Sequence, residues 1–66
     1  MSAREFSFIL RGLIRDSHMT YAQLAQKSGV SAKTILHWVR GDNAPSIETA
    51  GYVLEALGYK IEVVNA

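Results

Sequence analysis

Few side chains in this sequence are of the types that catalysis or metal binding needs. The 66 residues include two histidines, His18 and His37, and no cysteine. The histidines fall in different parts of the chain and the carboxylates are scattered, so neither a catalytic triad nor a metal cluster is indicated. The lack of cysteine also excludes a disulfide framework and a thiolate zinc site. We therefore expect no enzymatic activity and no cofactor.

The charged side chains are unevenly distributed, although the net charge is only +1. Residues 17–41 contain Lys27, Lys33 and Arg40 and no aspartate or glutamate, whereas most of the carboxylates lie in residues 42–66. A segment with only positive charges suits a surface that faces a polyanion such as nucleic acid. The charges alone leave open the alternative of an ordinary solvated surface.

The length and hydropathy of the chain restrict its organisation. We expect one domain over residues 1–66, and because so small a core gives a thin margin of stability, we also expect dimerisation. No apolar run approaches the roughly 20 residues that span a bilayer, and the N-terminus lacks the apolar region of a signal peptide. The expectation is a cytoplasmic protein without a membrane partner.

Apolar spacing predicts an amphipathic first helix over about residues 4–16. Its core-facing side is predicted to consist of Phe6, Ile9, Leu10, Leu13 and Ile14. Phe8 falls among the arginines on the opposite side, where another segment covers it or a partner can reach it.

Two short helices follow, over about residues 21–28 and 32–40. Each has a capping residue before it and a glycine after it, as helix ends commonly do. These residues are Thr20 with Gln23 as a capping box and Gly29 for the first, and Ser31 and Gly41 for the second.

The turn between these two helices, residues 29–31, is so short that they must cross steeply. Ala25 supplies the small residue that such a crossing requires. Ile35 and Trp38 on the second of the two helices face the core, and we expect Trp38 to be a core residue and not a base-stacking one. The pattern predicts a helix-turn-helix.

Ser46 is the predicted cap of a fourth helix over about residues 47–57, and Gly58 follows its end. Gly51 inside this helix costs about 1 kcal/mol relative to alanine. We therefore expect another helix to pack closely against Gly51.

Residues 59–64 alternate in polarity and contain β-branched and aromatic side chains, which predicts a strand. A lone strand needs a partner, and the same strand of a second subunit can pair with it antiparallel across a two-fold axis. The predicted dimer contacts are Tyr59, Ile61 and Val63. The alternative is an irregular tail folded over the first helix.

Residues 20–41, TYAQLAQKSGVSAKTILHWVRG, resemble the helix-turn-helix of the phage Cro and repressor family, also called the XRE family. The resemblance extends more loosely through NAPSIETAGYVLEALG, which is similar to the family's loop and following helix. It implies an all-α, lambda-repressor-like domain of four helices, here with a short C-terminal β-strand. In that family the first helix of the motif crosses the DNA backbone and the second enters the major groove.

The resemblance implies base contacts from Ala32, Lys33, Thr34 and His37. The same residues occupy the surface opposite Ile35 and Trp38. Lys33 could donate to guanine O6 and N7, His37 could donate or accept according to its tautomer, and Ala32 could touch a thymine methyl. The alternatives are a phosphate contact for Lys33 and a solvated surface position for His37.

Contacts with the DNA backbone would position the domain without specifying sequence. The expected side chains are Tyr21, Gln23, Lys27, Ser31, Arg40, Asn43 and Ser46, with N–H groups of the loop before the fourth helix. Tyr21 stands where the family usually has a glutamine that braces a phosphate and a base-contacting side chain, and its hydroxyl can still reach a phosphate. Asp42 would repel phosphate, so we expect it to face away from the DNA.

A second departure from the family pattern concerns Val39, where the family commonly has a glutamate that pairs with an arginine on the first helix. The matching first-helix position here is Ile14. Both ends of the usual buried ion pair are apolar, as expected if the pair was replaced whole, since losing one partner costs about 3–5 kcal/mol. We predict that Ile14 and Val39 touch.

These features predict a sequence-specific transcriptional regulator that binds double-stranded DNA. The expected form is a repressor that binds a two-fold symmetric operator as a homodimer. The alternative is an antitoxin or antirepressor that uses the same fold to hold another protein, with Phe8, Tyr52 and the acidic C-terminal part as its contact surface. A toxin or another regulator therefore stays open as a protein partner.

Overall fold

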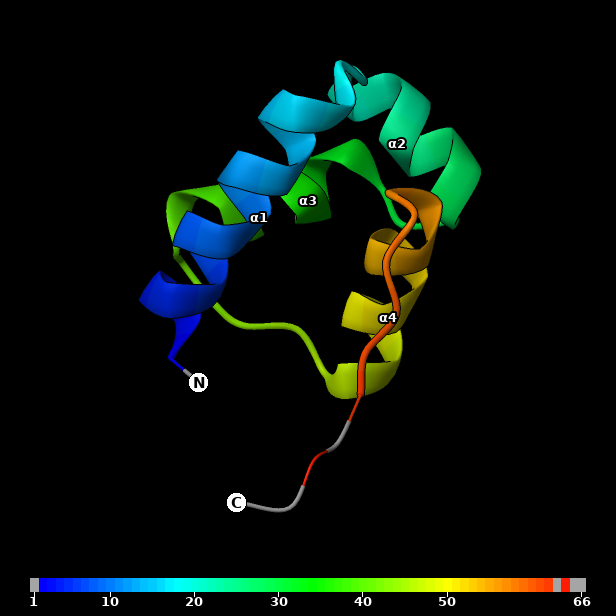
Figure 1. Cartoon of the computed structure of the whole chain (residues 1–66). Helices are drawn as coiled ribbons and strands as arrows, with labels where there is room; N and C mark the ends of the chain where they lie inside the picture. Colours follow the sequence, from blue (N-terminus) through cyan, green and yellow to red (C-terminus); the bar gives the residue numbers. More distant parts are fainter. Residues whose placement is uncertain (1, 63, 65–66) are drawn as a thin grey trace.

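The computed structural model describes residues 2–62 and 64, most of which lie in four helices (Figure 1). These are α1 (Ala3–Ser17), α2 (Tyr21–Ser28), α3 (Ala32–Arg40) and α4 (Ile47–Ala56). Helix α1 packs against α3, α3 against α2, and α2 against α4. None of the helices in the described part is long and apolar enough to cross a membrane.

The bounds of α2 and α3 follow from the predicted caps. Thr20 Oγ1 accepts from the N–H of Gln23 (3.1 Å), and the N–H of Thr20 donates to Gln23 Oε1 (2.9 Å), which completes a capping box. Ser31 caps α3 through its side chain. Gly29 and Gly41 end the two helices with φ of 80° and 78°, left-handed conformations that glycine adopts without steric cost.

A further capping box, which the sequence analysis did not identify, starts α1 at Ala3. The N–H of Ser2 donates to Glu5 Oε1 (3.2 Å), and Ser2 Oγ accepts from the N–H of Glu5 (3.1 Å). The hydrogen bond from the Ser2 backbone lowers the pKa of the Glu5 carboxyl, and the Ser2 side chain lowers it further. The box therefore favours an ionised Glu5 at a helix N-terminus, where a negative charge is stabilising.

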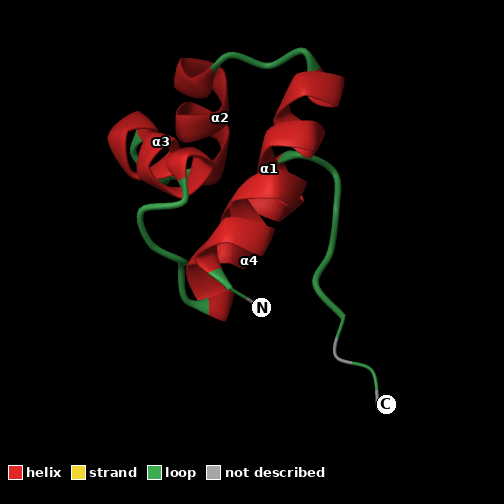
Figure 2. Cartoon of the chain, turned by 90° about the vertical axis from the view of Figure 1, so that its left-hand side faces the viewer, coloured by secondary structure: helices red, strands yellow, loops and turns green. Residues whose placement is uncertain are grey.

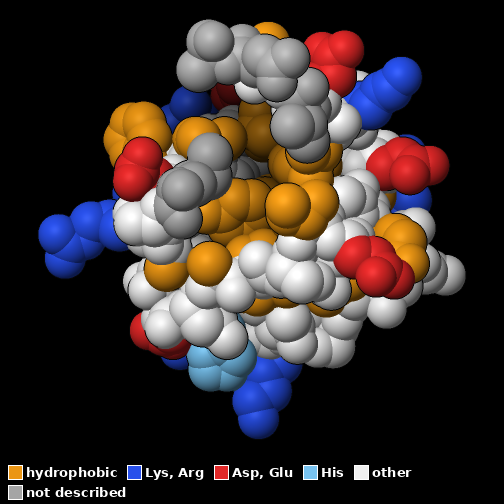
Figure 3. Space-filling view, turned by 90° about the horizontal axis from the view of Figure 1, so that it is seen from below, with side chains coloured by type: hydrophobic (Ala, Val, Ile, Leu, Met, Phe, Trp, Pro, Cys, Tyr) orange, Lys and Arg blue, Asp and Glu red, His pale blue; other side chains and the backbone are white. Residues whose placement is uncertain are grey.

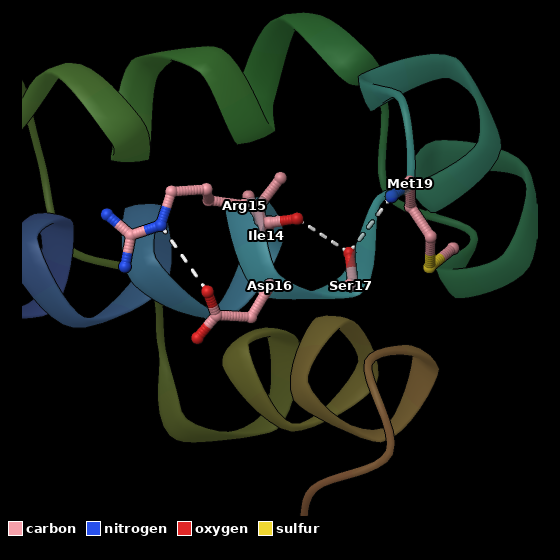
Figure 4. A network of polar contacts seen from close by, with 5 residues as sticks. All are labelled: Ile14, Arg15, Asp16, Ser17 and Met19. Atoms are coloured by element: carbon pink, nitrogen blue, oxygen red, sulfur yellow. Dashed lines mark hydrogen bonds and ion pairs between the residues drawn. The ribbon is translucent and has the colours of Figure 1, made fainter.

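The connection from α1 to α2 is fixed by Ser17 (Figure 4). Its hydroxyl donates to the carbonyl oxygen of Ile14 (2.7 Å) and accepts from the N–H of Met19 (3.1 Å). His18 between them has a left-handed backbone with φ of 61°. Met19 then packs against the buried core, so this turn delivers the chain to the start of α2 with its apolar side chain inward.

The buried core draws on all four helices. It consists of Phe6, Leu10, Ile14, Leu24, Ile35, Trp38, Val39, Ala50, Val53 and Ala56. Trp38 is only 3% exposed, and its ring meets that of Phe6 edge to face with centroids 6.1 Å apart. Trp38 is therefore a core residue, as predicted. Ile14 and Val39 both belong to this cluster, and a direct contact between them stays a prediction.

Hydrophobic side chains gather at the centre of the face shown in Figure 3. A groove of about 390 Å³ has walls from α1, the loop before α4, α4 itself and Ile61. Over the described residues the backbone of α4 comes close to that of α2 and not to that of α1. Ile9 borders this groove and is 44% exposed, so its predicted place in the core was wrong, and Leu13 is only half-buried.

Residues 59–62 and 64 form no strand (Figure 2), contrary to the prediction for residues 59–64. A strand requires a ladder partner, and within one chain this segment runs back along α4. Ile61 Cδ1 lies 3.9 Å from where a Cβ would stand on Gly51. The expected close packing of a helix at Gly51 was therefore wrong, because the nearest group there is a tail side chain at an ordinary contact distance. Val63 lies outside the described residues.

Candidate nucleic-acid interface

The predicted base-contacting residues lie on the side of α3 that faces away from the core. Lys33 is exposed, and Ala32, Thr34 and His37 are half-buried. The opposite side of the helix is buried through Ile35, Trp38 and Val39. The buried side of α3 therefore fixes the helix in the fold, and its outer side presents a polar surface.

The two hydroxyl groups at the start of α3, those of Ser31 and Thr34, form a hydrogen bond with each other. Ser31 Oγ accepts from the N–H of Thr34 (3.2 Å) and donates to Thr34 Oγ1 (2.9 Å). The oxygen of Thr34 thus has one partner already, and its own proton remains available for an acceptor outside the helix. This bond also restricts the Ser31 side chain, which was expected to contact a phosphate.

The end of α3 brings a carboxylate onto the polar side of the helix. His37 Nδ1 and Asp42 Oδ2 are 3.1 Å apart, and the two side chains are 44% and 54% exposed. The expectation that Asp42 faces away from the recognition surface was therefore wrong. The physical cause is the left-handed Gly41, which turns the chain back so that the N–H of Asp42 reaches the carbonyl oxygen of His37 (3.1 Å).

Helix α1 holds the C-terminal end of α3 through Ser7, a residue that the sequence analysis did not single out. Ser7 is only 7% exposed, and its hydroxyl donates to the carbonyl oxygen of Val39. That carbonyl is one of the last four of α3, which have no partner within the helix. The available signal was the spacing, because Ser7 falls on the same side of α1 as Leu10 and Ile14.

The predicted phosphate-contacting side chains are all exposed but come from separated places. Gln23, Ser31 and Ser46 belong to helix N-termini, where each already accepts a capping hydrogen bond. Lys27, at the other end of α2, borders a surface hollow together with Glu55 of α4. The structure therefore groups Lys27 with α4, apart from the residues of α3.

Comparison with known protein families identifies the family to which this arrangement of helices belongs. The model of the HTH_3 helix-turn-helix family matches residues 10–64. The chain belongs to this family. It is thus a DNA-binding domain of the XRE and Cro type, a family without enzymatic activity. Searches of curated proteins and of solved structures gave no match.

Within this helix-turn-helix domain, α2 and α3 are the two helices of the motif, and α3 is the one that enters the major groove in such domains. In the part of the chain that the structure describes, no three His, Cys, Asp or Glu side chains are grouped so that they could hold a metal ion. The polar groups of α3 and its flanks are therefore the candidate functional groups of this domain.

Proposed function

We propose that this helix-turn-helix domain is a transcriptional repressor that binds a two-fold symmetric operator as a homodimer. The observation that supports the proposal is the division of α3 into a buried side and an outer side with Lys33 and His37. Neither α2 nor α3 contains a carboxylate, and the one carboxylate at the end of α3, that of Asp42, lies against His37. An operator half-site would receive one copy of α3 in its major groove.

Lys33 is the base-contacting residue with the largest proposed effect. It is exposed near the N-terminal end of α3, the part of a recognition helix that lies deepest in the groove. Its ammonium group can donate to guanine O6 and N7. Ala32 would pack against a thymine methyl, and Thr34 would donate its hydroxyl proton to a base or phosphate acceptor.

The backbone contacts would come from groups around α3. Tyr21 and Gln23 stand at the N-terminus of α2, Arg40 at the end of α3, and Asn43 and Ser46 in the loop before α4. Helix N-termini carry partial positive charge and free N–H groups, which favours phosphate there. Such contacts set the register of α3 without specifying sequence.

The proposed dimer uses the apolar surface next to the C-terminal tail. Ile47, Tyr59 and Ile61 are 72%, 51% and 38% exposed, and Val63 continues the same segment. A two-fold axis beside Tyr59, Ile61 and Val63 would let the two tails pair antiparallel and would cover this surface. Truncation after Gly58 tests the proposal: the shortened chain should sediment as a monomer, and a persisting dimer contradicts tail pairing.

Selection of bound sites from random duplex DNA tests the function itself. The expected result is a two-fold symmetric site with half-sites about one helical turn apart. Lys33→Ala should weaken specific binding by about 1–3 kcal/mol and relax the preference at one position of each half-site. Arg15→Ala, which removes the same charge from the exposed side of α1, is the matched control. Equal discrimination by both variants would contradict base contact by Lys33.

A second candidate function is a protein-interaction module, as in an antitoxin or antirepressor. It is favoured by Phe8, which is 74% exposed on α1, and by Tyr52, which is 51% exposed on α4 and donates to Glu48 (3.0 Å). Large exposed aromatic side chains are typical of protein contacts. If no specific site emerges from the DNA selection, this function replaces the first, and Phe8→Ala and Tyr52→Ala are the variants that would abolish it.

A further inference from the structure

The contact between His37 and Asp42 joins a proposed base-contacting side chain to a residue outside the helix. Asp42 Oδ2 lies 3.1 Å from His37 Nδ1, which leaves Nε2, at the other side of the ring, as the second polar atom of the imidazole. His37 is half-buried on the outer side of α3. The question is whether Nε2 is a hydrogen-bond donor or an acceptor.

For the neutral ring, the chemistry of the two groups answers it. An ionised carboxylate only accepts hydrogen bonds, so the bond to Asp42 requires a proton on His37 Nδ1. A neutral imidazole carries one proton, and with Nδ1 protonated, Nε2 is an acceptor. Without a partner, a neutral histidine side chain in water favours the opposite tautomer, with the proton on Nε2.

We propose that Asp42 is a positioning residue that selects the tautomer of His37 and thereby the base that His37 recognises. An acceptor at Nε2 pairs with the amino groups that adenine (N6) and cytosine (N4) expose in the major groove. It has no favourable pairing with the O6 and N7 acceptors of guanine. This inference rests on the proposed function and specifies which bases one position of the operator contains.

The backbone keeps the two side chains together. The N–H of Asp42 donates to the carbonyl oxygen of His37 (3.1 Å), and the N–H of Gly41 donates to that of Trp38 (3.0 Å). These are the two hydrogen bonds of a Schellman motif, which places the second residue after the helix beside the residue one turn before its end. An apolar contact usually joins these two positions, and here the histidine and the carboxylate replace it.

The other charged groups around this helix end do not compete for the proton on Nδ1. Lys33 and Arg40, on α3 itself, are donors. From α1, the backbone of Arg4 comes close to Gly41, with its Cα 3.9 Å from where a Cβ of residue 41 would stand. Arginine is a donor as well, so Asp42 is the acceptor in contact with this ring.

Nitrogen NMR of the free protein tests the tautomer without DNA. Spectra recorded at pH 8.5, where histidine side chains in general are neutral, should show a protonated Nδ1 for His37 in the wild type. Asp42→Ala should shift the ring toward the Nε2-protonated form, and Asp42→Asn, whose side-chain oxygen can still accept, should restore the wild-type form. An Nε2-protonated His37 in the wild type overturns the proposal.

Site selection from random DNA tests the consequence. At pH 8.5, where histidine side chains in general are neutral, the wild type should prefer adenine or cytosine at the His37 position, and Asp42→Ala should lose about threefold to tenfold of that preference, the value of one net hydrogen bond. Asp42→Asn should retain it. Glu55→Ala, which removes an exposed carboxylate from α4, is the control for charge and should leave the preference unchanged.

The outcomes separate this inference from the function on which it rests. If the wild type selects no specific site, the proposed function fails and the inference with it. If it selects a site whose preference at the His37 position is the same in Asp42→Ala, only the inference fails. In a His37→Ala background Asp42→Ala should have no further effect on base preference, and a remaining effect would mean that Asp42 acts independently of the histidine.

Discussion

The helix-turn-helix, residues 20–41, and the C-terminal part, residues 47–64, differ in how completely the chain covers their apolar side chains. In the first, Leu24 and Ile35 are fully buried and Trp38 nearly so. In the second, Val53 is fully buried, but Ile47 is 72% exposed and several more apolar side chains of α4 and the tail lie open. The first part is complete within one chain, whereas the second has an apolar surface left over.

The contrast has a simple origin in the packing order. Helices α2 and α3 are sandwiched, because α3 also packs on α1 and α2 also packs on α4. In the described chain the backbone of α4 comes close to that of α2 and not to those of the other helices, and α1 stands across the groove from it. A terminal helix with one neighbour can bury only one side, so substitutions in the two parts should have different consequences.

The largest expected effect is a loss of stability on truncating the core of the motif. Ile35→Ala should lower the free energy of unfolding by about 2–5 kcal/mol, because it removes a fully buried side chain between α3 and its neighbours. Ile47→Ala, on the exposed side of α4, should change it by no more than about 0.5 kcal/mol. Urea unfolding of both variants at concentrations where the chain is monomeric compares them, and similar losses would contradict the contrast.

Ser7→Ala should have the next largest effect, a loss of about 1–3 kcal/mol. The substitution leaves the buried carbonyl oxygen of Val39 without the hydroxyl that it accepts from. The same urea titration measures the loss. A neutral result would mean that water reaches the end of α3, and that α1 does not fasten the recognition helix there.

The two glycines of the C-terminal part should respond in opposite directions. Gly51→Ala should raise stability by about 0.5–1 kcal/mol, because its position is helical and the nearest atom to the added Cβ is at an ordinary contact distance of 3.9 Å. Gly58→Ala should lower stability by about 1–2 kcal/mol, because its φ is 92°. Thermal unfolding measures both, and a destabilised Gly51→Ala would show that the tail packs more tightly on α4.

The smallest effect concerns the pH dependence of stability. The pKa of Glu5 is lowered in the folded chain by its capping bonds to Ser2. The ionised carboxylate therefore contributes stability above its unfolded pKa, and this contribution is lost as the pH falls through the lower, folded value. Glu5→Gln retains a capping side chain that does not titrate, so its stability should fall slightly less on acidification. Parallel slopes for the two proteins would contradict a role of the charge.

Local sequence signals were sufficient to predict the four helices, because each helix end depends on neighbouring residues. The hydroxyls of Thr20, Ser31 and Ser46 accept from N–H groups three residues later, and Gly29 and Gly41 supply the left-handed backbone that ends α2 and α3. Such bonds join residues only a few positions apart, so they can be predicted from the order of residue types along the chain. The same holds for the buried side of α3.

Contacts between distant segments could not be obtained in this way. The bond from Ser7 to Val39 joins residues that lie 32 positions apart, and the exposure of Ile9 depends on how far α4 stands from α1. The predicted strand failed for a related reason, because a strand exists only where a second one pairs with it. No property of residues 59–64 alone supplies that partner within one chain.

For the helix-turn-helix itself, the sequence by itself determined where α2 and α3 begin and end and which side of α3 is buried. The tertiary structure decided how the end of α3 is arranged, since Asp42 turns toward His37 where the charge alone suggested that it faces away. Gly41 was visible in the sequence as a helix stop. Only the folded backbone showed that this stop brings a carboxylate against a proposed base-contacting side chain. A hydrogen bond requires a suitable distance and angle between donor and acceptor, and the residue types alone do not give these.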